Sequence, residues 1–293
     1  QQVVAEELGV VPARVRVSAT DTSKVPNTSA TAASSGSDLN GMAAKDACRK
    51  LRARLAEFVA QKWGVDSGAV RFVADGVEAD TADGLQRWTF DDLAHKAWFG
   101  RVSLSAQGFY RTPKIHWNVK TFKGRPFYYF AYGAACAQVA IDTLTGEMKV
   151  ERVDLLHDVG SSLNPALDKG QVEGAFIQGM GWLTGEELVW NAKGVLTTHA
   201  PSTYKIPTAA DVPEIFNVGL VENSPNREDT IYRSKAVGEP PFMLAFAVYH
   251  AVRDAVSAAG DYRAAPQLTA PATAEAILRA VDEVKARMAR WTT

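Results

Sequence analysis

The chain has 293 residues, enough for one large domain or two ordinary ones with a sizeable buried core. Its 32 Lys and Arg residues are balanced by 33 Asp and Glu residues, so nucleic acid or an anionic membrane is not expected as the main partner. No apolar run reaches the ~18–20 residues of a membrane span, and the opening residues lack the pattern of a signal peptide. The cysteines, Cys48 and Cys136, form no CxxC pair, so we expect reduced thiols and a cytoplasmic protein.

The chain opens on QQVVAEELGVV, a helical pattern with neither an initial Met nor a capping residue. We expect a fragment or processed chain whose first helix is entered midway; trimming of a few residues is the alternative. A strand is predicted over residues 15–18. The stretch over residues 20–38 is rich in Ser, Thr, Ala and Gly, which is typical of a flexible linker.

Asp38 is predicted to cap a helix that extends to Trp63. The predicted elements after it are a strand with a turn, an exposed acidic loop, a short helix and a second strand, at residues 70–77, 78–84, 91–99 and 102–110. From residue 127 the pattern is β-rich, and two long alternating runs joined by Thr145-Gly146 predict a hairpin.

Asn164 and Pro165 begin a helical apolar pattern that four glycines interrupt. Each interior glycine costs roughly 1 kcal/mol relative to alanine, so we expect this helix to pack very close to another element. The remaining predictions are a hairpin, a strand and two helices, at residues 186–198, 216–221, 241–259 and 272–289. Strands, hairpins and helices in this mixture indicate an α+β fold.

The sequence contains no phosphate-binding loop, no HExxH motif and no GxSxG elbow, and its five histidines are never spaced as a metal pair. Three polar, glycine-marked segments remain as candidates for chemistry. They are TSATAASSGSD, GQVEGAFIQG and SKAVGEPP, at residues 28–38, 170–179 and 234–241. In the first, small side chains would let a bulky ligand approach the backbone, whose N–H groups could hold phosphate or pterin-type polar edges. A linker remains the alternative.

In the second segment, Gln171 and Gln178 lie two helical turns apart, so both could point to one side and recognise an oxo or amide group. The alternative is a core helix packed through its glycines. In the third, Glu239 precedes Pro240 and Pro241, which favours an extended conformation just outside a helix. Such a carboxylate could complement the helix dipole or act as a rigidly held general base.

Together, several stretches resemble the molybdenum hydroxylase (xanthine oxidase) family, in that family's order and at very similar spacing. They are PNTSATAASSGSDLNG (26–41), GFYRTP (108–113), DVGSSLNPALDKGQVEGAFIQGMGWLTGEEL (158–188), PSTYKIP (201–207) and SKAVGEPP (234–241). The resemblance covers most of the chain and is weakest over residues 60–100. It implies that residues 1–293 form the C-terminal portion of the family's molybdopterin-binding domain, and the sequence marks no clear internal boundary.

The resemblance also implies residue roles. Glu239 matches the general base that takes the proton of a hydroxo ligand on molybdenum, which also carries oxo and sulfido ligands and is held by a pterin. Ala33 matches a residue beside the metal coordination sphere, and Gln178 is a weaker candidate near the cofactor. Lys235 could set the electrostatics of the site or be a surface lysine. The full set implied at the cofactor is Thr31, Ala32, Ala33, Ser34, Ser35, Gln171 and Lys235.

The implied activity is the hydroxylation of hypoxanthine and xanthine to urate, with electrons passed through 2Fe-2S clusters and FAD to NAD. The iron–sulfur and FAD domains, and the N-terminal part of the molybdenum region with its substrate-orienting residues, are expected on other parts of a dimeric assembly. SKAVGEPP and PNTSATAAS favour the xanthine branch. The alternatives are a sibling aldehyde or N-heterocycle hydroxylase and a non-catalytic scaffold module.

Overall fold

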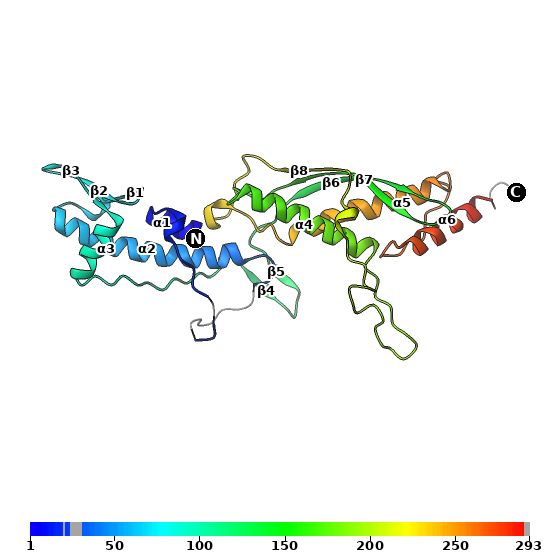
Figure 1. The fold of residues 1–293 in the computed structure, drawn as a ribbon, viewed down its shortest axis with the longest axis horizontal. Helices are drawn as coiled ribbons and strands as arrows, with labels where there is room; N and C mark the ends of the chain where they lie inside the picture. Colours follow the sequence, from blue (N-terminus) through cyan, green and yellow to red (C-terminus); the bar gives the residue numbers. More distant parts are fainter. Residues whose placement is uncertain (20, 24–30, 290–293) are drawn as a thin grey trace. The chain divides into compact units, whose positions relative to one another are not determined.

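The computed structural model describes residues 1–19, 21–23 and 31–289. Within the polar stretch predicted at residues 20–38, residues 20 and 24–30 lie outside these ranges. The chain divides into two compact units, residues 1–128 and 129–293. Both combine helices with small sheets, which confirms the predicted α+β class (Figure 1). In the described ranges, no helix has the length and apolar character needed to cross a membrane.

The first unit is built around one long helix, α2, which ends at Gly64 in the left-handed conformation. Leu55, Phe58 and Val59 of this helix are buried against the second strand of a three-stranded antiparallel sheet and against helix α3. The elements of this unit are α1 (Gln2–Leu8), η1 (Pro12–Arg14), α2 (Gly36–Trp63), η2 (Ser67–Ala69), β1 (Arg71–Val73), β2 (Gly76–Thr81), β3 (Gly84–Thr89), α3 (Phe90–Phe99), β4 (His116–Asn118) and β5 (Lys123–Arg125).

Three predictions for this unit are wrong. Residues 15–18 form no strand, and among the described residues no other strand pairs with them. The acidic loop at 78–84 is part of the β2–β3 hairpin, in which the alternate residues Val77 and Ala79 are fully buried. Residues 102–110 also form no strand.

Side chains of α2 supply the partners that a strand neighbour would supply to residues 102–110. Arg54 donates to the Ser103 carbonyl (2.5 Å), and Lys50 donates to the Gln107 carbonyl (3.1 Å). The carboxylate of Asp46 accepts the Phe109 N–H (3.0 Å). The segment therefore satisfies part of its backbone along a helix rather than in a ladder.

The second unit contains a three-stranded sheet in the order β6-β7-β8. Strands β6 (Gly133–Ile141) and β7 (Met148–His157) form the hairpin predicted at Thr145-Gly146, where Gly146 has a φ of 76°. Strand β8 (Ile215–Leu220) then pairs with β7 in parallel. The register of β6 and β7 shifts between Gln138 and Val139, which leaves one extra residue, Glu151, on β7. The shift lets Val150 and Val153 both be buried although they are three residues apart.

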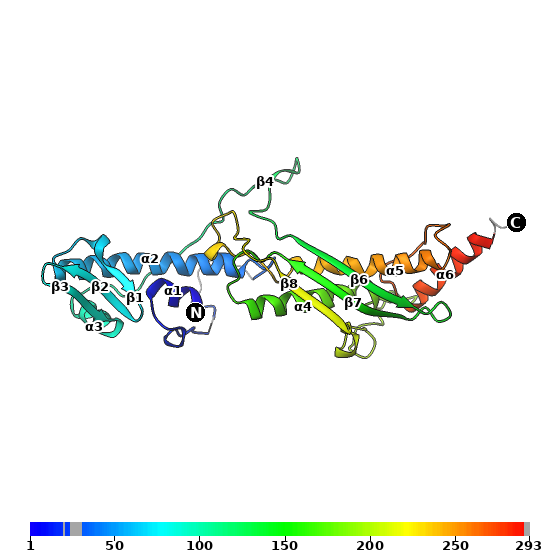
Figure 2. The same ribbon diagram turned by 90° about the horizontal axis from the view of Figure 1, so that it is seen from above.

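Helices α4 (Pro165–Thr184) and α5 (Phe246–Ala258) cover one face of this sheet, and α6 (Ala274–Ala289) packs against α5 (Figure 2). Helix α5 is preceded by a 3-10 segment, η5 (Pro240–Ala245), that packs on α4. The shared core includes Val153, Phe176, Val248, Val252, Ile277 and Val281, all fully buried. The predicted helices after residues 241 and 272 are confirmed, apart from the 3-10 start of the first.

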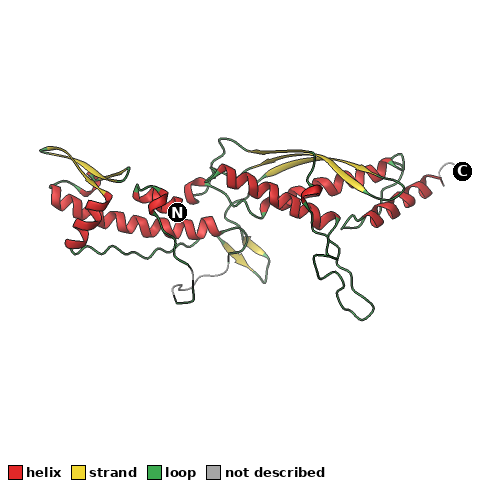
Figure 3. Cartoon of the chain, in the orientation of Figure 1, coloured by secondary structure: helices red, strands yellow, loops and turns green. Residues whose placement is uncertain are grey.

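The chain between α4 and β8 is mostly loop (Figure 3). The hairpin predicted at residues 186–198 is present only as a single isolated bridge, Trp190 to Leu196, around the tight turn at Gly194. The same connection between α4 and β8 includes the short 3-10 segment η3 (Ala209–Asp211), and a further 3-10 segment, η4 (Ile231–Arg233), follows β8.

Candidate functional site

The segment Thr31–Ser35 forms the turn that leads into α2. Ala33 and Ser34 both have a φ of 53°, in the left-handed region that non-glycine residues seldom adopt. The Ala32 carbonyl accepts the Ser35 N–H (3.3 Å) and the Ser35 hydroxyl (2.9 Å). Thr31, Ala32 and Ala33 are exposed, so the segment presents backbone and small side chains to its surroundings.

The helix after this turn begins earlier than the sequence predicts. Helix α2 starts at Gly36, and Asp38 lies in its first turn rather than at the capping position. A side chain at Gly36 would place its Cβ only 3.3 Å from the Thr31 methyl group. Glycine at this position therefore leaves room for Thr31 to pack over the start of the helix.

Gln171 and Gln178 are both exposed on α4, as expected for residues two turns apart on one side. The neighbouring glycines divide into two groups. A Cβ at Gly179 would lie 2.6 Å from the Phe242 carbonyl oxygen, so the helix packs closely there, as predicted. A Cβ at Gly170 or Gly174 would meet no atom within 4 Å, so the glutamine-bearing side of the helix is open.

Lys235 is not a surface lysine. Its side chain is 8% exposed, and its ammonium nitrogen lies 2.5 Å from the carboxylate of Asp158, which is 10% exposed. The same nitrogen lies 5.4 Å from the centre of the Tyr132 ring. The position of the charge is therefore set by a buried ion pair.

Glu239 is exposed at the start of η5, where its carbonyl accepts the Phe242 N–H (3.0 Å). Its backbone is helical (φ −95°, ψ −35°), so the predicted extended conformation is wrong. The bond to Phe242 explains the difference, since it turns the chain at Glu239 despite the crowding of the following proline. The two prolines occupy the first helical positions, as predicted.

The residues before Glu239 pair with the segment that follows β7. Gly160 and Ser234 form an antiparallel bridge, the Lys235 N–H donates to the Val159 carbonyl (2.8 Å), and the Ser161 N–H donates to the Arg233 carbonyl (2.9 Å). Gly160 has a φ of 67°, and a Cβ there would lie 2.5 Å from the Arg233 carbonyl oxygen. Only glycine permits this approach without strain.

Sequence reasoning did not single out His157 or Asp158, at the end of β7. His157 is 1% exposed, and neither of its ring nitrogens has a hydrogen-bond partner in the part of the chain that the structure describes. Burial lowers the pKa of this imidazole, and Lys235 lowers it further while Asp158 raises it. Neither residue carries a local sequence signal, since polar residues also occur earlier in β7.

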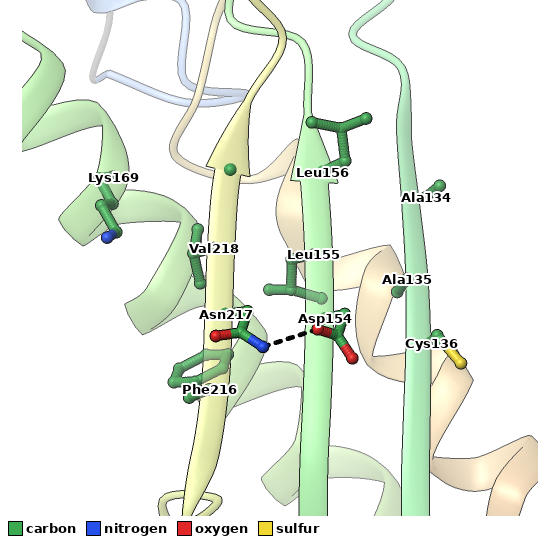
Figure 4. Close-up of a pocket in the computed structure, with 11 residues that line it drawn as sticks. Ala134, Ala135, Cys136, Asp154, Leu155, Leu156, Lys169, Phe216, Asn217 and Val218 are labelled. Atoms are coloured by element: carbon green, nitrogen blue, oxygen red, sulfur yellow. Dashed lines mark hydrogen bonds between the residues drawn. The ribbon is translucent and has the colours of Figure 1, made fainter.

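A separate cavity of about 620 Å³ lies on the β6-β7-β8 sheet (Figure 4). Across it, Asn217 donates to Asp154 (2.7 Å), which also accepts from Arg152 (2.6 Å). Arg152, and then Asn217, lower the pKa of Asp154 to about 2. The residues that line this cavity include none of the predicted site residues, so it is distinct from the candidate site.

Each unit has one described feature that bears on the binding of an organic cofactor. Within the described ranges, no three His, Cys, Asp or Glu side chains gather as a metal site. In the first unit, the exposed turn at Ala33 presents backbone and small side chains. In the second, a Cβ at Gly170 or Gly174 would meet nothing within 4 Å, so the glutamine-bearing side of α4 can accept a bulky group such as a pterin.

Comparison with known proteins gives one family match and many relatives. A model described as a molybdopterin cofactor-binding domain matches residues 1–213. Xanthine dehydrogenase/oxidase from Mus musculus is 44% identical over 289 residues, which are 96% of this chain and 20% of the relative. Xanthine dehydrogenase from Blastobotrys adeninivorans is 43% identical over 282 residues, 94% of this chain and 18% of the relative. The chain thus spans about a fifth of the length of these relatives.

Solved structures with the same fold include reconstituted CO dehydrogenase from Oligotropha carboxidovorans and quinoline 2-oxidoreductase from Pseudomonas putida 86. The first has a TM-score of 0.77 and 21% identity and covers 97% of this chain and 34% of that chain. The second has a TM-score of 0.77 and 23% identity and covers 96% of this chain and 34% of that chain. At this identity the likeness shows the fold.

Proposed function

Because this chain belongs to the molybdopterin cofactor-binding domain family, we propose that it forms the C-terminal part of the molybdenum site of a hypoxanthine and xanthine hydroxylase that produces urate. The relatives named xanthine dehydrogenase support this substrate. They are about five times longer than this chain, which supports further parts carrying 2Fe-2S clusters and FAD, with NAD as acceptor, in a dimeric enzyme. The two free cysteines support a cytoplasmic location.

The molybdenum–molybdopterin group, when bound, supplies the oxidising metal centre and the oxygen that is transferred to the purine. On this chain, Thr31, Ala32, Ser34 and Ser35 contribute backbone groups and hydroxyls to its binding. Ala33 would lie beside the metal, where its short methyl side chain would leave room for the cofactor. Gln171 contributes an amide from the open face of α4, with Gln178 as a weaker candidate.

Glu239 is the general base. The observation that carries this role is its exposed carboxylate at the first turn of a segment whose other end is buried in the core, where Leu244 and Ala245 lie. An exposed side chain can reach a bound purine and accept a proton, while the prolines and the anchored residues before it restrict where it moves.

Lys235 belongs to the same site through its charge and its place in the chain. Lys235 lies four residues before the base, and its ammonium forms an ion pair with Asp158. It therefore contributes to the electrostatic field around the cofactor and to the course of the backbone, rather than as a freely moving ligand.

The test is xanthine-dependent NAD reduction by the intact enzyme, wild type beside Glu239→Gln. The amide keeps the shape of the side chain and removes its basicity, so kcat should fall at least ~10²-fold at equal molybdenum content. Glu222→Gln, at another exposed glutamate of the same unit, is the matched control and should leave kcat unchanged. Full turnover by Glu239→Gln would refute the base.

Substrate profiling separates the related activities. Turnover of xanthine without turnover of aldehydes is expected. Aldehyde or quinoline-type turnover without xanthine turnover would assign the chain to a sibling hydroxylase. A purified complex that contains neither molybdenum nor pterin would instead favour a non-catalytic scaffold.

A further inference from the structure

A buried ion pair lies directly behind the segment that carries Glu239. Asp158 and Lys235 are 77 residues apart in sequence and come within 2.5 Å, with about nine-tenths of each side chain buried. Removing two charges from water is costly, and such a pair is commonly no better for stability than well-packed apolar residues. Its presence therefore calls for a role other than stability alone.

The contacts around the pair are suited to fixing a position. The second carboxylate oxygen of Asp158 accepts the Gly160 N–H (2.8 Å), and the Asp158 N–H donates to the Tyr132 carbonyl (2.8 Å). Asp158 is thus held from two sides before it meets Lys235. A carboxylate fixed in this way restricts the ammonium of Lys235 to one position.

The backbone after Lys235 is held as well. The Lys235 N–H donates to the Val159 carbonyl, and the Ala236 N–H donates to the Tyr129 hydroxyl (2.8 Å). Val237 packs against the core of the unit. Only Gly238 then separates these fixed residues from Glu239, so the position of the base follows from them.

We propose that Asp158 is a positioning residue for the general base: it holds Lys235, and through the three residues that follow it fixes the carboxylate of Glu239 against the bound purine. The proposal rests on the proposed function of Glu239. The role proposed for Asp158 acts through Lys235 and not through contact with substrate or cofactor. Loss of its charge should displace the base without emptying the site.

The experiment uses the intact enzyme with Asp158→Asn, which keeps an acceptor for the Gly160 N–H and removes the charge. A displacement of about 1 Å at a reacting group can cost about 10²-fold, so we expect a loss of that order in kcat for xanthine, with KM and molybdenum content unchanged. The amides of Lys235 and Ala236 should exchange hydrogen faster, while those of β6 and β7 should not. A folded Asp158→Asn enzyme with wild-type kcat per molybdenum overturns the proposal.

The control is Glu214→Gln. It removes an exposed pair between Glu214, just before β8, and Lys149 on β7 (2.8 Å; side chains 72% and 60% exposed), and it should change neither turnover nor exchange. If Asp158→Asn alone does not fold, the double variant Asp158→Asn/Lys235→Met leaves no unpaired buried charge. Because Lys235→Met itself alters the field at the cofactor, the readout here is hydrogen exchange: faster exchange of the Ala236 amide in the folded double variant supports the proposal, and unchanged exchange overturns it.

The two proposals fail in different ways. Failure of the proposed function appears as full turnover by Glu239→Gln. Failure of the positioning role appears as unchanged exchange of the Lys235 and Ala236 amides in Asp158→Asn, whatever the substrate proves to be.

Discussion

The two segments proposed to face the cofactor are built in different ways. Thr31–Ser35 is a turn, exposed at Thr31–Ala33, in which Ser35 bonds back to the Ala32 carbonyl. The segment over residues 234–239 is tied by a bridge, an ion pair and a tyrosine hydroxyl to residues far away in sequence. A surface that only has to admit a bulky group can be made by omitting side chains. A base that must meet one proton has to be fixed by partners.

The substitution Gly160→Ala tests this difference and should have the largest effect on stability. A Cβ at a φ of 67° and 2.5 Å from the Arg233 carbonyl oxygen should cost about 2–5 kcal/mol from the left-handed conformation and the overlap together. The apparent melting temperature of the intact protein should fall, and residues 233–239 should exchange hydrogen faster.

Gly174→Ala is the matched control, since its Cβ would meet nothing within 4 Å and alanine favours a helix by about 1 kcal/mol. It should not lower the melting temperature. Equal melting temperatures for the two variants would mean that the bridge to Ser234 does not hold the segment.

A smaller effect is expected from Ala33→Val. A β-branched side chain in the left-handed region adds about 1–3 kcal/mol of strain, which corresponds to roughly 5–150-fold weaker cofactor binding if the turn must keep its conformation. Molybdenum content should fall while the melting temperature stays nearly constant, because Ala33 is exposed and is not part of either buried core cluster. Ala33→Gly should retain molybdenum, and a valine variant with full molybdenum would show that the turn is not a close neighbour of the cofactor.

The smallest effect concerns His157, beneath the anchored segment. Its folded pKa lies below the ordinary 6.5, mainly through burial, with Lys235 lowering it and Asp158 raising it. As pH falls below about 6.5, this histidine binds a proton in the unfolded chain but stays neutral in the folded chain. The free energy of unfolding therefore decreases, by at most about 1.4 kcal/mol per pH unit. Above that range the stabilisation is fully present.

His157→Leu should remove this part of the pH dependence, measured as the melting temperature from about pH 7.5 to about pH 5. His199→Leu, at an exposed histidine of the same unit, should keep it. An unchanged slope in His157→Leu would show that the imidazole is not the group that titrates.

Local signals in the sequence predicted much of this fold correctly. The apolar spacing of α2, the turn at Gly146 and the helix break before α6 all depend on neighbouring residues, and all three are confirmed. The failures depend on distant partners. Residues 102–110 alternate like a strand, but their backbone bonds to side chains of α2.

In the candidate site too, residues with local sequence signals were predicted and residues that depend on distant partners were missed. Glu239 and the segment around Ala33 stand out because their glycine and proline neighbours are local features, and the resemblance to a known family gave them roles. Asp158 carries no local signal, since an aspartate after a strand is an ordinary residue. Its importance comes from a lysine 77 positions away, and only the folded chain brings the two together.

The same separation bears on when the site forms during folding. Closing a loop of this length costs little more in free energy than closing a short one, but long-range contacts form slowly because the intervening chain must first be ordered. Lys235 follows β8, which pairs with β7 in parallel, so α4 and the crossover to β8 lie between the two partners of the ion pair. We therefore expect Glu239 to reach its working position late in folding, so that a chain that stalls earlier carries the glutamate without an ordered base.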